Sequence, residues 1–125
     1  MLLHEYLTSV RQAIEKIDMY GYAESIDIQE EIRAGKQAIL KISVTLVDGS
    51  SFHIKEYISA KYHIEKVSYG YQYQDRDGNL VFRYDNASHK PALKFIQHKH
   101  LITGDIVEAD LPAIEELVDE IIGHL

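Results

Sequence analysis

The chain has 125 residues, 46% of them hydrophobic and 26% charged, with no cysteine and a net charge of −7 at pH 7. This length and composition fit one globular domain over residues 1–125 and exclude a disordered chain, a fibrous repeat, a disulfide framework and a thiolate metal site. No apolar run approaches the roughly 18 residues that cross a bilayer, and the sequence starts without a basic leader, so we expect a cytoplasmic protein that has no contact with membranes.

The first segment of the chain has the spacing of an amphipathic helix. Gly21 is expected to end this helix, because glycine enters the left-handed conformation without a steric cost. The apolar residues recur every three or four positions and form one stripe: Leu3, Tyr6, Leu7, Val10, Ile14 and Ile17.

From Tyr22 to Asp85 the apolar period changes to two, which predicts a series of antiparallel strands. In the hairpin at Asp48–Gly49 we expect Ser50 to join the loop, since this register sets Val44 opposite Ile54 and keeps one face apolar. The same register places Glu56 on that apolar face, where a carboxylate needs a partner such as Lys41 or Arg83.

A second hairpin is predicted around a two-residue turn at Asp77–Gly78. The turn sets an aromatic ladder on one face and polar residues on the other. The expected pairs are Tyr73 with Phe82, Tyr71 with Tyr84, Gln72 with Arg83, and Gly70 with Asp85. The tyrosines could stack on nucleic-acid bases, but aromatic strand faces are more often core packing.

Residues 86–109 lack any period and are expected to be irregular, and a final amphipathic helix follows. Asp110 is its expected N-cap, Pro112 lies in the first turn, and an apolar stripe extends over residues 114–125. The predicted fold is therefore α+β: an antiparallel meander of about five strands, flanked by an N-terminal and a C-terminal amphipathic helix on one face of the sheet.

The middle of the chain concentrates cationic side chains although the net charge is negative. Residues 50–100 carry 8 Lys or Arg against 5 Asp or Glu, a balance of +3, whereas residues 101–125 carry none against 7. Histidine exchanges a proton near neutral pH, and loops on a rigid sheet often carry such groups. The candidate catalytic residues are Glu56, Arg83, Asp85, His89, His98 and His100, and the candidate nucleic-acid contacts are Gln72, Asn86, Lys90 and Lys99.

Three functional interpretations compete, beside the possibility that these side chains form only a solvated loop. The first is metal-free cleavage of RNA, in which one group takes the proton of the ribose 2′-OH, another protonates the departing 5′ oxygen, and cations stabilise the phosphorane. The second is a metal site made by His98, His100, His89 and Asp85, although histidines two positions apart are not a specific zinc spacing. The third is binding of a phosphate backbone without reaction.

Several runs resemble the TumE family, the toxin components of type II toxin–antitoxin systems. The resemblance covers about residues 38–100 and departs from the family pattern at Ser88–His89–Lys90 and at His98–Lys99–His100. The runs that carry it are Val47–Ser50, His53–Tyr57, Tyr69–Gln74, Asp77–Gly78 and Phe82–Ala87, with His89 and His98–His100 after them. It implies a protein that harms its host when released and that a cognate antitoxin neutralises.

We therefore predict a toxin that acts on RNA as a metal-independent ribonuclease, without a cofactor. Glu56 or His89 is the expected base and His98 or His100 the expected acid. Arg83 and Lys99 are the expected phosphate cations, and Asp85 and Asn86 are expected to orient the histidines. The alternative is a non-enzymatic module whose basic loop binds nucleic acid or protein, so the sequence leaves open whether the protein is an enzyme. The edge strand over residues 22–33 could pair with a second copy or with the antitoxin.

Overall fold

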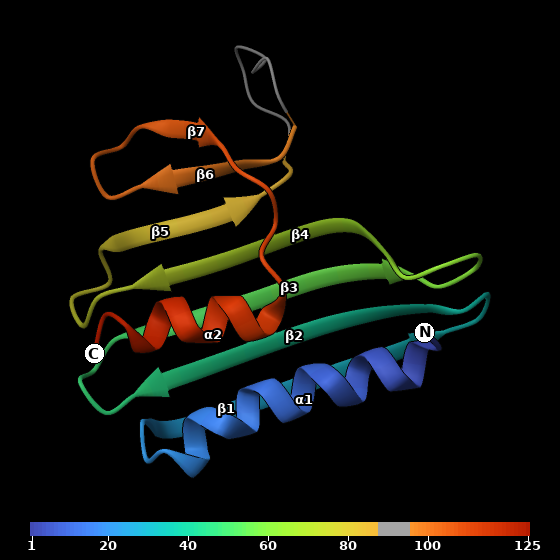
Figure 1. Cartoon of the computed structure of the whole chain (residues 1–125), viewed down its shortest axis with the longest axis horizontal. Helices are drawn as coiled ribbons and strands as arrows, with labels where there is room; N and C mark the ends of the chain where they lie inside the picture. Colours follow the sequence, from blue (N-terminus) through green and yellow to red (C-terminus); the bar gives the residue numbers. More distant parts are fainter. Residues whose placement is uncertain (88–95) are drawn as a thin grey trace.

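The computed structural model describes residues 1–87 and 96–125 of the chain. A single antiparallel sheet in the order β1 to β7 carries both helices on one face (Figure 1). The elements are α1 (Leu3–Met19), β1 (Ala23–Arg33), β2 (Gln37–Leu46), β3 (Ser51–Ser59), β4 (Glu65–Gln74), β5 (Leu80–Asp85), β6 (His98–Leu101), β7 (Ile106–Glu108) and α2 (Ile114–Ile122).

The α+β class is confirmed, but the described sheet has seven strands and not about five. The two extra strands, β6 and β7, lie in the stretch that the sequence predicted to be irregular. They contain only 4 and 3 residues, which is too short for an alternating pattern to emerge. No helix in the described parts of the chain is long and apolar enough to cross a membrane.

Both predicted helices are present, and their apolar stripes pack on the sheet. In α1 the stripe is buried as expected, and Gly21, with φ of +74°, follows the C-cap residue Tyr20. The start of α2 differs from the prediction: Asp110 is not the N-cap, because the helix begins at Ile114 after Ala113. The intervening segment crosses from β7 to the helix layer before the α2 helix can form (Figure 1).

The predicted register is confirmed in one hairpin and wrong in the other. The β4–β5 pairs are those expected, with Gln72 opposite Arg83. In the β2–β3 hairpin, Val44 lies opposite Phe52 and not opposite Ile54. The loop there contains only residues 47–49, closed by a hydrogen bond of 2.8 Å from the Leu46 amide to the Ser50 carbonyl, so Ser50 does not join the loop.

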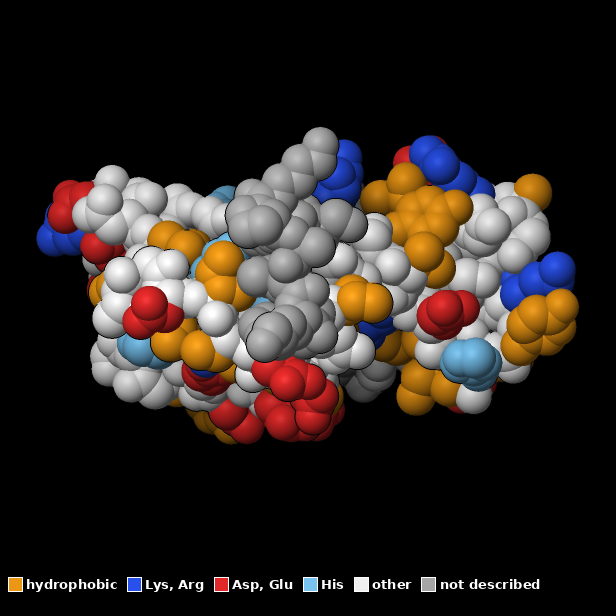
Figure 2. All heavy atoms as spheres, turned by 90° about the horizontal axis from the view of Figure 1, so that it is seen from above, with side chains coloured by type: hydrophobic (Ala, Val, Ile, Leu, Met, Phe, Trp, Pro, Cys, Tyr) orange, Lys and Arg blue, Asp and Glu red, His pale blue; other side chains and the backbone are white. Residues whose placement is uncertain are grey.

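The two faces of the sheet differ in chemistry. The helix-covered face is the core, and the aromatic ladder of β4 and β5 belongs to it, with Tyr71 fully buried. The tyrosines therefore pack in the core and do not form a surface for bases. The other face, which we call the open face, carries the polar side chains of each strand. In a view of the molecule from above, acidic side chains gather mainly along the lower edge of the picture, and several Lys and Arg side chains are visible along its upper edge (Figure 2).

Candidate functional site

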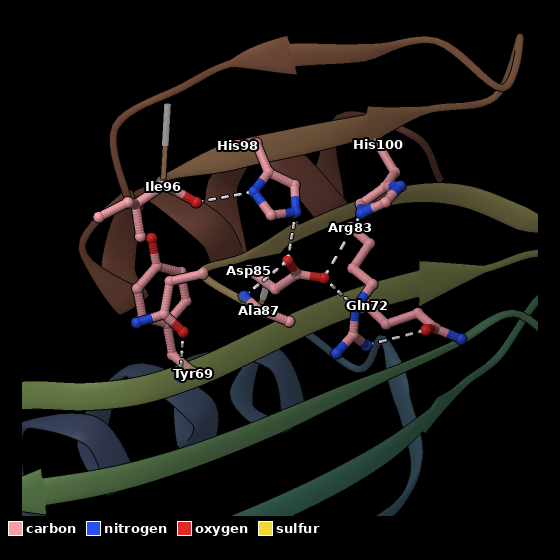
Figure 3. A network of polar contacts seen from close by, with 9 residues as sticks. Tyr69, Gln72, Arg83, Asp85, Ala87, Ile96, His98 and His100 are labelled. Carbon is pink, nitrogen blue, oxygen red and sulfur yellow. Dashed lines mark hydrogen bonds and ion pairs between the residues drawn. The ribbon is translucent and has the colours of Figure 1, made fainter. Parts of the chain in front are cut away.

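Four of the predicted site residues meet on the open face, on β5 and β6. Asp85 lies opposite His98, and Arg83 lies opposite His100. Because residues two positions apart on a strand share a face, this register brings all four side chains to one place. The network that they form with Gln72 of β4 is drawn in Figure 3.

Asp85 is at the centre of this network and is only 4% exposed. Its carboxylate accepts a hydrogen bond of 2.6 Å from Nε of Arg83 and contacts Nε2 of His98. Nε2 of His100 lies at 3.5 Å from the same carboxylate. One buried carboxylate therefore contacts three groups that carry or accept protons, and two of them are histidines that we expected it to orient.

Arg83 lies flat against the backbone of β4. A Cβ atom at position 70 would lie 2.4 Å from Nη2 of Arg83, so only glycine leaves room for the guanidinium group there. Nη1 donates a hydrogen bond of 3.0 Å to Oε1 of Gln72, while Nη2 has no acceptor in the described parts of the chain. The Arg83 side chain is 36% exposed, so an anion that arrives from solvent can reach the guanidinium group.

The two histidines have different access to solvent. The His98 side chain is fully buried, and its Nδ1 lies 2.7 Å from the carbonyl oxygen of Ile96. Since Nε2 faces Asp85, both ring nitrogens have oxygen partners, and the ring donates to both only when both carry a proton. The rings of His98 and His100 meet edge to face at 5.0 Å. His100 is 21% exposed and is the histidine of this pair that a ligand can reach.

Within the described residues, the hydrogen bonds of the Asn86 side chain go to the backbone of β4 and not to His98 or His100. Its Oδ1 accepts a hydrogen bond of 3.1 Å from the Tyr69 amide, and its Nδ2 donates one of 3.1 Å to the Val67 carbonyl. The side-chain amide thus continues the β4–β5 pairing beyond the end of β5. Asn86 therefore supports the strand that carries Gly70 and Gln72.

Glu56 lies on the opposite face from this network, in the core beneath α1. It is fully buried, and its carboxylate accepts a hydrogen bond of 2.5 Å from the Tyr6 hydroxyl and another from the Tyr71 hydroxyl. Its ionic partner is Lys66 at 3.3 Å, and not Lys41 or Arg83 as expected. The predicted gathering of Glu56 with Arg83 and the histidines is therefore wrong.

Lys99 also points to the helix-covered face, since it alternates with His98 and His100 along β6. Its Nζ lies 2.6 Å from Oε1 of Glu120 on α2 and 4.6 Å from the centre of the Tyr84 ring. Burial alone would lower the pKa of Lys99, but the hydrogen bonds to Glu120 and Tyr84 raise it above its usual value. Lys99 therefore joins α2 to the sheet and does not accompany Arg83.

The remaining predicted site residues, His89 and Lys90, lie outside the described residues.

The donor atoms of Asp85, His98 and His100 lie within 4.8 Å of one another. A carboxylate with two imidazoles is a set that zinc accepts, although Arg83 already occupies one oxygen of Asp85. Among the described residues, these three side chains are therefore the group that could hold a metal.

Sequence reasoning missed four positions that line a hollow of the open face together with Arg83. They are Lys41, His53, Lys55 and Gly70. The signal that could have found the first three is cross-strand register, because in the observed β2–β3 pairing Lys41 lies directly opposite Lys55. The predicted register, shifted by two residues, separated these two lysines.

Comparison with known proteins agrees with the resemblance noted in the sequence. The family model described as "Toxin TumE" matches residues 10–125. No match was found among curated proteins or among solved structures. The match extends beyond the segment that carried the resemblance and adds part of α1, β1, β7 and α2. The chain therefore belongs to the TumE toxin family.

Proposed function

We propose that this toxin cleaves RNA at the open face of its sheet, with Arg83 binding a phosphate group and His100 transferring a proton. The observation that carries the proposal is that Asp85 holds a partly exposed arginine and a partly exposed histidine side by side. A fixed guanidinium group and an imidazole supply charge stabilisation and acid–base catalysis without a metal.

The proposed reaction is transesterification within the RNA chain. The 2′ oxygen of one ribose attacks the neighbouring phosphorus while a base removes its proton, and the bond from phosphorus to the 5′ oxygen breaks. His100 gives a proton to that leaving oxygen, so the products are a 2′,3′-cyclic phosphate and a free 5′-hydroxyl. Arg83 stabilises the additional negative charge on the phosphorane oxygens.

Asp85 and His98 are positioning residues in this proposal. Asp85 contacts Arg83, His98 and His100, and the buried His98 ties Asp85 to the Ile96 carbonyl. Glu56 has no part in the reaction, since it lies in the core. His89 stays the sequence-based candidate for the base, because it lies outside the described residues.

Membership of the family implies a cognate antitoxin as the partner. We propose that β1 is one surface available to it, because β1 lies at the edge of the sheet and pairs only with β2 among the described strands. An unpaired edge accepts an added strand from an antitoxin or from a second copy. A cytoplasmic location, where RNA and an antitoxin meet, is part of the same proposal.

The proposal is tested by RNA cleavage with purified protein in EDTA, together with growth after induced expression. We expect His100→Ala to slow cleavage by about 10²–10⁴-fold, the range for loss of an acid–base group, and to relieve toxicity. His63→Ala is the matched control, since His63 is exposed and lies in the β3–β4 loop, and it should behave as wild type.

Three outcomes would contradict the proposal, each in a different way. Equal cleavage by wild type and His100→Ala would remove His100 from the reaction. Cleavage that EDTA abolishes would instead support a metal held by Asp85, His98 and His100. RNA that is bound but left intact by the wild type would support the non-enzymatic alternative.

A further inference from the structure

A hollow of about 430 Å³ opens on the face of the sheet beside Arg83. It extends over β2, β3 and β4 and ends at the guanidinium group that lies on Gly70. Its polar side chains come from four strands and include Lys41, Ser43, His53, Lys55, Gln72 and Arg83. No carboxylate side chain lines this hollow among the described residues, although the whole chain has a net charge of −7.

The two lysines of the hollow lie opposite each other, and neither forms an ion pair among the described residues. Lys41 lies directly opposite Lys55 across β2 and β3, and like charges in this position destabilise a sheet. In the described parts of the chain neither lysine has a carboxylate within ion-pair distance, whereas Arg83 has Asp85. An anion bound between the lysines would remove this repulsion.

Cross-strand register aligns the hollow with the proposed site in two neighbouring rows. One row runs from Lys41 through Lys55 and Gly70 to Asp85. The neighbouring row contains the next set of paired residues on the same face of the sheet. They are Ser43, His53, Gln72, Arg83 and His100. With strands about 4.8 Å apart, the path from β2 to β5 is about 14 Å long, enough for a short stretch of nucleic-acid backbone.

We propose that this hollow binds the ribose-phosphate backbone of single-stranded RNA and leads it to Arg83. The inference rests on the proposed function, and it adds Lys41, Lys55 and His53 as contacts of the substrate outside the reacting centre. The hollow presents cations and hydroxyls, while the tyrosines of β4 point into the core. It therefore contacts phosphates more than bases, and its binding depends on salt more than on sequence.

The test measures the affinity of a fluorescent, 2′-O-methylated single-stranded RNA, which cannot be cleaved, at several salt concentrations. Neutralising both lysines in Lys41→Gln/Lys55→Gln should weaken binding and reduce the slope of log K against log salt by about 1.4, at about 0.7 for each phosphate contact with a single strand. Lys16→Gln is the matched control, because Lys16 is exposed in the last turn of α1; it should keep the wild-type slope.

A melting curve shows whether the double variant is folded. Removing a like-charge pair should leave its melting temperature equal to that of the wild type or higher, so lost binding cannot come from unfolding. Inorganic phosphate should raise the melting temperature of the wild type more than that of the double variant. Binding of a single-stranded DNA of the same sequence shows how far the 2′ oxygen contributes beyond the phosphates.

The outcomes separate this inference from the proposed function. If the wild type cleaves RNA but the double variant binds the uncleavable strand with an unchanged slope, the hollow is not the backbone site and the catalytic proposal stands. If the double variant loses binding but neither it nor the wild type cleaves RNA, the hollow is confirmed as the backbone site and the catalytic proposal fails. A wild type that binds no RNA overturns both.

Discussion

The protein buries one carboxylate on each face of its sheet, and the two have opposite surroundings. Glu56 on the helix-covered face is closed in by the hydroxyls of Tyr6 and Tyr71 and by Lys66. Asp85 on the open face is bound by Arg83 and histidines, and Arg83 reaches solvent. Two carboxylates with similar burial are thus a structural centre in one case and the support of a partly exposed cation in the other.

The difference shows that burial of an ionisable group does not by itself indicate a functional site. What distinguishes Asp85 is the exposure of its cationic partner: the Arg83 side chain is 36% exposed, whereas that of Lys66, the cationic partner of Glu56, is 18% exposed. Substitutions at Glu56 should therefore change the stability of the protein, and substitutions around Asp85 should change the binding or cleavage of RNA.

The largest effect is expected at Glu56. In Glu56→Ala the ammonium group of Lys66 and the two tyrosine hydroxyls lose their common acceptor, and removing one partner of a buried ion pair costs about 3–5 kcal/mol of unfolding free energy. Urea denaturation measures this loss. Glu24→Ala, at an exposed position of β1, is the control and should change stability little. A Glu56→Ala protein as stable as wild type but inactive on RNA would return Glu56 to the catalytic site.

The same cluster predicts a loss of stability at alkaline pH. Burial, and then the Glu56 carboxylate, raise the pKa of Tyr6 and of Tyr71 above the ordinary value of 10.0. Above about pH 10 these tyrosines ionise in the unfolded chain but stay neutral in the folded one. The unfolding free energy should therefore fall by about 1.4 kcal/mol per pH unit for each tyrosine, while the contribution is constant below pH 10.

Urea midpoints between pH 9 and pH 11.5 test this expectation. Tyr6→Phe removes one of the two ionisable groups and should reduce the slope above pH 10, whereas Tyr62→Phe should not, because Tyr62 is 86% exposed. Equal slopes in all three proteins would show that the buried Tyr6 is not linked to folding in this way.

The sequence predicts the two helices and the division of faces, because period and parity are local properties. It does not predict hairpin loop lengths. The loops at 47–49, 76–78 and 102–104 share a three-residue form that ends in a glycine with positive φ. Reading Asp77–Gly78 as a two-residue turn still gave the correct β4–β5 pairs, because an irregularity between Tyr73 and Gln74 restores the register.

The candidate site, like the fold, was predictable only where the spacing of residues along a strand decides which face they share. Asp85 with Arg83, and His98 with His100, stand two positions apart and share a face once β5 and β6 pair. Lys99 between the histidines must point the other way, but this argument requires β6 to be a strand, and four residues gave no such signal. The alternation of apolar and polar residues already placed Glu56 on the apolar face of the predicted strand. The expected contact between Glu56 and Arg83 therefore conflicted with the predicted strand pattern.

A smaller effect, on activity, is expected at Gly70 beneath Arg83. A Cβ in Gly70→Ala would meet Nη2 of Arg83 at 2.4 Å and push the flexible end of that side chain away. Losing a charge-assisted hydrogen bond to phosphate costs about 1.5 kcal/mol or more, about tenfold in RNA cleavage. The double variant Gly70→Ala/Arg83→Ala should cleave no more slowly than Arg83→Ala alone. Additive losses would mean that position 70 acts independently of Arg83.

The smallest effect distinguishes two lysines on opposite faces. Lys99 binds Glu120 with both side chains partly exposed, and a pair of this kind contributes about 1 kcal/mol or less, so Lys99→Gln should lower the unfolding free energy slightly and leave the salt dependence of RNA binding unchanged. Lys55→Gln should do the reverse, keeping stability and lowering the slope by about 0.7. The two variants remove the same charge, so net charge cannot explain a difference between them. If the two variants reduce the slope equally, RNA binding responds to the charge of the whole chain and does not depend on which face of the sheet carries the lysine.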